Sequence, residues 1–477
     1  MATTTRPAEQ GLGWGLEREM NALEAVMWRA ESDPRLRSTI LGLEILETVP
    51  AWDRYLAAHD WASRMVPRFR QHVVEPVFGL GQPTWVVDPD FDLSYHVRRA
   101  RLAEPTYACL LEAVQTLAMT PFDKARSPWE TVLFEGLPDG RAGYALKLHH
   151  STTDGLGAVQ LLGGLHSRTA VPNPDKPQPA APPAERPSHS RELARQAIRD
   201  VAGASRFGRR LTGSLGALRR PDKAVKDAAE FAASLRRVLS DPPAPPSPLL
   251  RERSMSWRFH ALDVMFADMR AAAKQHGCSL NDAFIAALLG AFRLYHVEHG
   301  CPIDEIPMAI PISVRKEGDK EGGNRIAAAR LAGPVAIEDP VLRMQKISEL
   351  VKGARSEPAM EALNALAPAM AWLPGPLIAQ LAGNTTKGTD LQASNVPGIR
   401  EDVYLAGAKI ERSYPFGPLP GCAAMIALVS HGQYCCIGAN IDAAAFTDVD
   451  GFGRCLEQGF NEVLALHPGS EPAVRRI

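Results

Sequence analysis

Two adjacent histidines and a nearby aspartate are the residues of this chain best placed to do chemistry. His149 and His150 end an alternating apolar run, residues 144–148, that is typical of a strand. Asp154 comes shortly afterwards, and the apolar spacing of residues 156–162 then predicts the start of a buried helix. A loop between a strand and a helix can hold a general base rigidly within reach of a substrate.

The two histidines cannot share one task. Successive side chains of an extended backbone point to opposite faces, so one ring addresses a cleft and the other supports it. Asp154 can bond the loop backbone or pair with a basic group. The residues alone also leave a plainer interpretation open, in which Asp154 forms an Asx-type turn and both histidines are ordinary loop residues.

The helices and strands that precede this loop in the sequence must position it beside a cleft. Apolar spacing predicts helices over residues 21–32, 52–65 and 105–119, and strands over residues 37–47, 68–77, 83–87 and 129–135. A Leu-Pro-Asp-Gly turn at residues 137–140 joins the last of these strands to the run that ends at His149. The sequence therefore predicts a hairpin that carries the histidine loop at its end.

A change of composition separates the two halves of the chain. Residues 171–190 are rich in Pro and Ala, and a second proline cluster occupies residues 242–248. Between Arg191 and Ser240, twelve Lys or Arg residues stand against five Asp or Glu, and leucines recur at helical spacing. This pattern indicates a basic helical crossover between stiff linkers. It is either a solvated linker or a segment that lies on an anionic lipid surface.

Helix and strand alternate again in the second half. Helices are predicted over residues 265–275, 279–299, 342–371 and 448–466, and extended segments over residues 254–264, 307–314, 390–398, 423–429 and 434–441. The fold class expected is therefore α/β. Its predicted divisions are an N-terminal domain over 1–185, a linker over 186–248 and a C-terminal domain over 249–477.

Composition excludes several classes of protein. The formal net charge is −1 and the sequence pI is about 6.9, which gives no case for nucleic-acid binding. The first ten residues lack the apolar core of a signal peptide, and no apolar run is long enough to span a membrane. The seven cysteines are scattered, so we expect reduced thiols, a cytoplasmic protein and no metal-ligand constellation.

Several motifs together resemble one enzyme family. The segment His149–Gly155 resembles the HHxxxDG motif of the CoA-dependent acyltransferase superfamily. Further blocks resemble the bacterial wax ester synthase/diacylglycerol acyltransferases in particular, and they come in the order expected for that family. These blocks are Phe91–Arg98, Arg126–Glu130, Leu280–Asp282, Pro311–Arg315 and Ser394–Gly398. The resemblance extends roughly from Phe91 to Asp442.

The resemblance implies a fold and a reaction. It implies two chloramphenicol-acetyltransferase-like domains with the active site in a channel between them. It implies transfer of a fatty acyl group from acyl-CoA to a long-chain alcohol or diacylglycerol, with acyl-CoA as co-substrate and no metal or other cofactor. It also admits an enzyme that is peripheral on the inner membrane face or on lipid droplets. The alternatives are a condensation-type, carrier-protein-dependent acyltransferase and a lipid-binding homologue without catalysis.

The resemblance also assigns roles to residues. His150 is the expected general base and His149 its support, while Ser394 and Asn395 are expected to stabilise the oxyanion. Asp154 is expected to pair with Arg315, and Gly155 to permit the turn and a close approach.

Two further predictions concern residues outside the loop. Asn281 is predicted either near the active centre or, with Asp282, in a first helical turn that Ser279 caps. Trp129 is expected to pack beneath the histidine loop.

Overall fold

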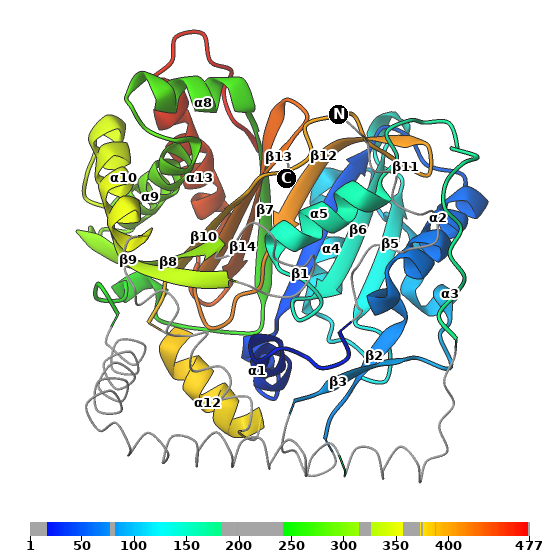
Figure 1. Cartoon of the computed structure of the whole chain (residues 1–477). Coiled ribbons are helices and arrows are strands. Elements are labelled where there is room, and N and C mark those ends of the chain that lie inside the picture. Colours follow the sequence, from blue (N-terminus) through cyan, green and yellow to red (C-terminus); the bar gives the residue numbers. More distant parts are fainter. Residues whose placement is uncertain are drawn as a thin grey trace, which may run out of the picture.

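The chain folds into two large sheets, each covered by helices (Figure 1). The structure is a computed structural model. It describes residues 17–76, 82–183, 198, 242–313, 326–355, 373, 375–386 and 388–475. The α/β architecture with two domains is the one predicted from the sequence. A small sheet of β2 (Gln71–Val74) and β3 (Thr84–Val87) accompanies the first large one.

Six strands form the first sheet, in the order β11-β12-β1-β6-β5-β4. Their bounds are β1 (Thr39–Leu46), β4 (Val97–Arg101), β5 (Trp129–Glu135), β6 (Ala142–His149), β11 (Tyr404–Leu405) and β12 (Ala408–Phe416). β5 and β6 form the predicted hairpin, so β6 carries His149 at its end. β1 pairs with β6 along its whole length and places Thr39 opposite His149.

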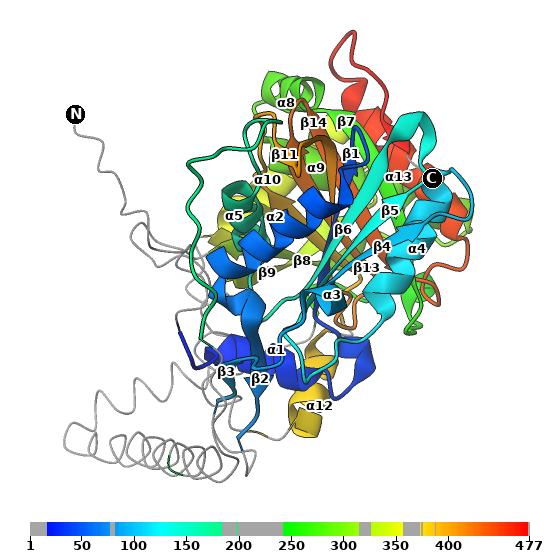
Figure 2. The same cartoon turned by 90° about the vertical axis from the view of Figure 1, so that its right-hand side faces the viewer.

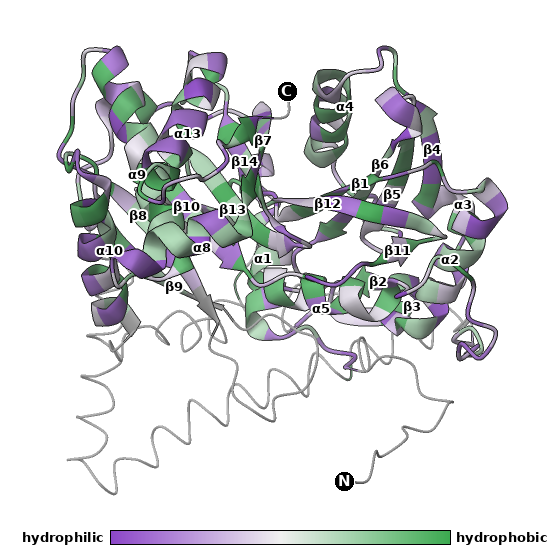
Figure 3. Cartoon of the chain, turned by 90° about the horizontal axis from the view of Figure 1, so that it is seen from above, coloured by the Kyte–Doolittle hydropathy of each residue, from purple (hydrophilic) through white to green (hydrophobic). Residues whose placement is uncertain are grey.

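Helices cover both faces of the first sheet (Figure 3). α2 (Trp52–Met65) and α5 (Gly155–Leu165) pack on the face that carries Leu146 of β6. α4 (Tyr107–Met119) packs on the opposite face, against Ala145. Neighbouring residues of β6 therefore enter different cores, as the alternation of a strand requires. The shorter helices of this half are α1 (Ala22–Ala30), η1 (Pro34–Leu36), η2 (Pro67–Arg70), α3 (Leu93–His96) and η3 (Pro138–Gly140).

Seven strands form the second sheet, in the order β15-β7-β14-β13-β10-β8-β9. Their bounds are β7 (Trp257–Met265), β8 (Glu305–Ser313), β9 (Ile326–Pro334), β10 (Leu391–Val396), β13 (Ala424–His431), β14 (Tyr434–Asp442) and β15 (Val474–Arg475). β13 and β14 form the predicted hairpin. β10 lies inside the sheet, parallel to both of its neighbours, so its backbone is paired on two sides.

Four helices lie together against the second sheet (Figure 1). They are α8 (Phe266–Gln275), α9 (Leu280–Glu298), α10 (Pro340–Arg355) and α13 (Val449–Leu464). Every residue of α9 from Asp282 to Phe292 is buried. The buried guanidinium of Arg343 in α10 joins three of these helices, because it pairs with Glu462 of α13 at 2.8 Å and donates to the Ala286 carbonyl of α9 at 2.9 Å.

Two strands of the first sheet come from the C-terminal half of the chain. β12 pairs antiparallel with β1, and β11 continues the sheet beyond it. Arg412 Nε of β12 lies 2.9 Å from Asp263 Oδ2 of β7, and the Tyr414 hydroxyl donates to Asp263 Oδ1 at 2.5 Å. The boundaries 1–185 and 249–477 stay predictions, but residues beyond 249 clearly complete the N-terminal sheet.

The end of the linker is firmly attached to the second sheet. The predicted crossover over 191–240 lies outside the described residues apart from Ile198. After it, η5 (Pro248–Leu250) leads towards β7. The Ser247 N–H donates to Asp390 Oδ2 at 2.7 Å, and Arg253 Nη2 lies 3.2 Å from Asp390 Oδ1. A buried carboxylate just before β10 therefore fixes where the linker ends.

α1 and α12 (Gly375–Thr386) bring the two halves of the chain together a second time (Figure 2). Ala30 and Leu36 pack with Ile378 and Ala379 in a small buried cluster. Since α1 also places Trp28 against the ring of His149, this cluster lies close to the predicted chemistry.

Two predicted elements differ in their extent. The extended segment expected over 68–77 begins with η2, whose first residue is Pro67, and proline favours the first position of a helical turn. The strand itself is then only β2. The helix predicted over 342–371 is described as far as Arg355, and residues 356–371 lie outside the described part of the chain.

Across the described ranges, no single helix has the length and apolar character needed to cross a membrane; α8 and α9, bent by 95° at their junction, meet that test as a pair by length and composition alone.

Candidate active site

His149 is a fully buried ring with a polar group close to each of its nitrogens. It ends β6 and has no exposed surface. The backbone N–H of Ser151 donates to His149 Nδ1 at 3.0 Å, and the Ser151 hydroxyl lies 2.7 Å from the same nitrogen. Because a backbone N–H can only donate, Nδ1 carries no proton. The ring proton is therefore on Nε2, which lies 3.1 Å from Glu31 Oε1.

Glu31 is a site residue that sequence reasoning missed. It follows α1 directly, and its Oε1 accepts the Ser38 N–H at 2.7 Å. Burial opposes ionisation, but His149, the Ser38 N–H and Lys124 together lower the pKa of Glu31 below its usual value. Glu31 is therefore a carboxylate that faces the buried histidine. No spacing rule links residue 31 to residue 149; the pairing of β1 with β6 and the packing of Trp28 of α1 against the His149 ring bring them together.

His150 has different surroundings from its neighbour. It is the first residue after β6 and is only partly buried. Its backbone N–H donates to the Ser38 carbonyl at 2.7 Å, so Ser38 binds both Glu31 and His150. The His150 ring also forms a hydrogen bond with the residue's own backbone.

The pKa of His150 favours a neutral ring. Burial is the largest influence and lowers the pKa below the usual value of 6.5. The hydrogen bond to its own backbone and the charge of Asp154 act in the opposite direction, and His149 adds to the lowering. A neutral imidazole that is partly accessible is the form a general base requires.

Asp154 caps the helix that follows the loop. Its Oδ1 accepts the Gly157 N–H at 2.7 Å, and the residue is almost fully buried. This is a standard N-cap, so Asp154 sets where α5 begins. Arg315 lies outside the described residues, so the predicted pair between Asp154 and Arg315 stays a prediction.

Gly155 differs from the expectation that glycine permits the turn. Its φ is not in the positive region, and a Cβ at this position would lie 3.5 Å from Val396 Cγ2, an ordinary contact. The turn itself therefore does not require glycine. The contact shows instead that the first turn of α5 lies against the end of β10, which carries Ser394 and Asn395.

The predicted oxyanion residues lie on a strand of the second sheet. Ser394 and Asn395 are partly buried near the end of β10. The chain then turns at Gly398, whose N–H donates to the Ser430 hydroxyl at 3.1 Å. A side chain on Gly398 would collide with the Ser430 backbone, so glycine is needed there. The fold thus brings α5, which follows a strand of the first sheet, into contact with β10, which is a strand of the second sheet.

Asn281 and Asp282 occupy the first turn of α9. The Ser279 hydroxyl accepts the Asp282 N–H at 3.2 Å, and Asp282 Oδ2 accepts the Ser279 N–H at 2.8 Å. This reciprocal pair is a capping box, which agrees with the structural alternative for Asp282. Among the described residues, the hydrogen bonds of this cap stay between Ser279 and Ala283. A role of Asn281 near the active centre stays a prediction.

Trp129 is a core residue below the loop. It is buried, its indole N–H donates to the Phe69 carbonyl at 2.7 Å, and its ring stacks on His96 at a centroid distance of 4.6 Å. Since β5 pairs with β6, this packing holds the hairpin that carries the histidines. Within the described ranges, no group of three or more His, Cys, Asp or Glu side chains could hold a metal ion.

Comparisons with known proteins agree on one family. The model of the wax ester synthase/diacylglycerol acyltransferase catalytic domain matches residues 20–284, and that of the WS/DGAT C-terminal domain matches residues 322–463. A Mycobacterium tuberculosis protein named for diacylglycerol O-acyltransferase activity is 40% identical over 98% of this chain and 96% of its own length. A second such protein of that organism is 28% identical over 92% of each chain.

Solved structures with this fold include an enzyme of the same kind. A wax ester synthase/diacylglycerol acyltransferase from Marinobacter aquaeolei VT8 has a TM-score of 0.64 at 22% identity, covering 93% of this chain and 98% of its own. The first condensation domain of the calcium-dependent antibiotic synthetase has a TM-score of 0.61 at 15% identity, covering 96% and 98% respectively. At these identities the likeness shows the fold alone.

Replacement of Glu31 tests the support of the two histidines. Glu31→Ala leaves the buried Ser38 N–H and His149 Nε2 without their carboxylate, and a lost partner of this kind costs about 1–3 kcal/mol. We expect a lower midpoint of thermal unfolding. Glu47→Ala, at an exposed position just after β1, is the matched control and should leave the midpoint nearly unchanged. Identical midpoints for the two variants would contradict a supporting role for Glu31.

Proposed function

This chain belongs to the wax ester synthase/diacylglycerol acyltransferase family, and we propose that it transfers a fatty acyl group from acyl-CoA to the hydroxyl of a diacylglycerol or long-chain alcohol. The observation that carries the proposal is the different surroundings of the two histidines. His149 is fully buried with a polar group close to each nitrogen, while His150 is partly accessible and burial lowers its pKa, which favours the neutral ring. Relatives named for this activity match nearly the whole chain.

The proposed reaction uses His150 as the base. Its Nε2 takes the proton of the acceptor hydroxyl as that oxygen attacks the thioester carbon, a step in which base catalysis contributes about 10²–10⁴-fold. Ser394 and Asn395 stabilise the negative oxygen of the tetrahedral intermediate. Its collapse breaks the carbon–sulfur bond, and the departing thiolate receives the proton back from His150. The products are a triacylglycerol or wax ester and free CoA.

We also propose that acyl-CoA is the only co-substrate and that the reaction needs no other cofactor. A thioester is already an activated acyl donor, so the chain has to supply a base, oxyanion donors and a dry site. The remaining alternative activities are weaker. The condensation domains share only the fold, and a homologue without catalysis would have no need of a base held in this way.

The acceptors of this reaction dissolve in lipid rather than in water. We therefore propose that the enzyme works as a peripheral protein at a membrane face or lipid droplet. Support comes from the sequence of the crossover, residues 191–240, with its twelve Lys or Arg against five Asp or Glu.

Flotation with liposomes tests the lipid-surface proposal. Anionic liposomes should carry the full chain upwards in a density gradient, and a variant without residues 191–240 should stay at the bottom. Neutral liposomes provide the control for charge, because they lack the attraction for Lys and Arg. Equal flotation of both variants on anionic liposomes would remove the lipid role of the crossover.

Replacement of His150 tests the base. With palmitoyl-CoA and either hexadecanol or dioleoylglycerol, His150→Ala should lower acceptor-dependent CoA release by at least about 10²-fold, because the general base is lost. His299→Ala changes an exposed histidine at the end of α9 and should leave release unchanged. Release of free thiol and circular dichroism measure turnover and folding. A correctly folded His150→Ala variant with near wild-type turnover would disprove the assignment.

The pH profile tests the protonation state of His150. Because its pKa is lowered below 6.5, the base is neutral above that value and is lost only as the pH falls further. We expect kcat/KM to be flat between pH 7 and 8 and to fall on the acid side below pH 6.5. Initial rates of CoA release across this range measure the profile. An acid limb centred at pH 7 or higher would show that the ring is not held neutral by burial.

A further inference from the structure

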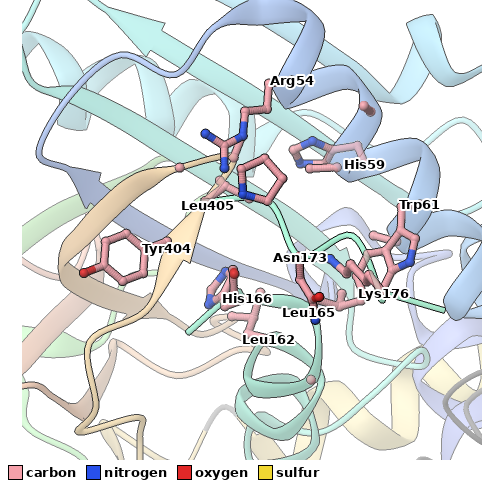
Figure 4. A pocket seen from close by; sticks show the side chains of 18 of the residues that line it. Arg54, His59, Trp61, Leu162, Leu165, His166, Asn173, Lys176, Tyr404 and Leu405 are labelled. Carbon is pink, nitrogen blue, oxygen red and sulfur yellow. The ribbon is translucent and has the colours of Figure 1, made fainter. Parts of the chain in front are cut away.

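A cavity lies towards the far end of α5. It has a volume of about 850 Å³ and opens between α2 and α5, over the face of the first sheet that carries Leu146 (Figure 4). This volume is within the roughly 300–1,000 Å³ range of small-molecule sites. His150 and Asp154 do not line it. Along α5, seven residues separate Gly155 at the end of the histidine loop from Leu162, the first helical residue that lines the cavity, which corresponds to about 10 Å of rise. We call it the α2/α5 cavity.

The wall of the α2/α5 cavity is largely apolar. Its apolar side chains come from α2, α5, the hairpin and β11, and they include Trp61, Trp129, Leu146, Leu162, Leu165 and Leu405. The chain after α5, residues 167–179, closes one side, and we call it the strap. The strap is held by α2, because the Trp61 indole N–H donates to the Pro177 carbonyl at 2.7 Å and Arg64 Nη1 donates to the Pro179 carbonyl at 3.0 Å.

The charged residues of the α2/α5 cavity are all cationic. Arg54, Arg168 and Lys176 line it, and no Asp or Glu is among its lining residues. Arg168 is neutralised by the exposed Glu401 at 3.1 Å, and Arg54 donates to a strap carbonyl, that of Ala170. Lys176 lies with its Nζ 3.1 Å from the centroid of the Trp61 ring. No ion pair of Lys176 with a carboxylate is found among the described residues.

Burial without a nearby anion also affects Lys176. It lowers the pKa of the ammonium group to about 8, so the group is still mainly charged near pH 7. The Trp61 ring stabilises this charge from one side, and an anionic group in the cavity would stabilise it further.

A second polar group without a full set of partners faces the same cavity. His166 ends α5, lines the cavity and is only 7% exposed. Its Nε2 lies 3.3 Å from the buried Glu44 Oε2, but its Nδ1 has no hydrogen-bond partner. Buried polar nitrogens are normally satisfied, so this orphan points to a water molecule in the cavity beside the ring.

We propose that the α2/α5 cavity binds a long-chain carboxylate, such as a free fatty acid, as a site separate from the active site. The carboxylate head pairs with Lys176 at the strap, and the alkyl chain lies against the leucines and tryptophans between α2 and α5. The positive charge of Lys176 favours an anionic head group, and the apolar wall of the cavity favours an alkyl chain. The site goes beyond the acyl transfer proposed above, because neither the donor nor the acceptor of that reaction is a carboxylate.

Binding of cis-parinaric acid to the delipidated full-length protein tests the proposal. The probe should fluoresce on binding, and palmitate should displace it far better than hexadecanol, which has the chain but no charge. Lys176→Met keeps the length of the side chain, removes the charge and should weaken parinarate binding by about tenfold or more. Lys346→Met, at an exposed position on α10, is the matched control and should have no effect.

Two further variants place the bound probe. Ala58→Phe puts a ring into the cavity from α2 and should remove binding, whereas His150→Ala should leave the affinity unchanged. Circular dichroism checks that Ala58→Phe is folded. If this variant does not fold, the affinity of Lys176→Met for the probe tests the proposal on its own. Unchanged affinity in Lys176→Met, equal displacement by hexadecanol, or full displacement by stoichiometric palmitoyl-CoA would each overturn the proposal. The last result would make the cavity the tail end of the acyl-donor site.

Discussion

The hydrogen bond from the Ser151 backbone to His149 Nδ1 is the contact on which the histidine loop depends. It places the proton of His149 on Nε2, where the Glu31 carboxylate lies. Both nitrogens of the buried ring thus face groups of the protein, the Ser151 backbone on one side and Glu31 on the other. We therefore propose His150 as the base, and the burial that lowers its pKa suits that role. Because the Ser151 N–H can only donate, it fixes the orientation and tautomer of His149 and makes the surroundings of this ring different from those of His150.

The site is assembled from parts that are distant in the sequence. The residue after α1 is Glu31, β6 ends at His149 with His150 directly after it, and β10 carries Ser394 in the second sheet. α5 connects them, since its capped start touches β10 and its other end forms a wall of the α2/α5 cavity. A helix held at both ends keeps the loop rigid, which is the requirement for a base that must meet its substrate in one geometry.

Local patterns in the sequence predicted the parts of this protein that depend on local physics. The helix over Trp52–Met65 has the predicted bounds because its apolar spacing is regular. The hairpin before His149 follows from a turn between two alternating strands. The motifs identified the family, and that resemblance located the histidine loop and the strand of Ser394.

Features that depend on contacts between residues far apart in the sequence could not be predicted from these local patterns. Glu31 and β12 carry no periodic signal that links them to residue 149 or to β1. Their places follow from which strands share a sheet, and a single sequence does not contain that information in any local pattern. The α2/α5 cavity is likewise a product of packing, because its wall combines residues from α2, α5, the strap and β11.

The position of β12 has a consequence for how the chain is made. β1 ends at Leu46, and the strand that covers its edge begins at Ala408, 362 residues later. At about 5–20 residues per second, a ribosome needs roughly 20–70 s to reach it. During that time the first sheet presents an unpaired edge, which is a template for aggregation. The N-terminal half therefore cannot mature as an independent unit, although it contains both histidines of the motif.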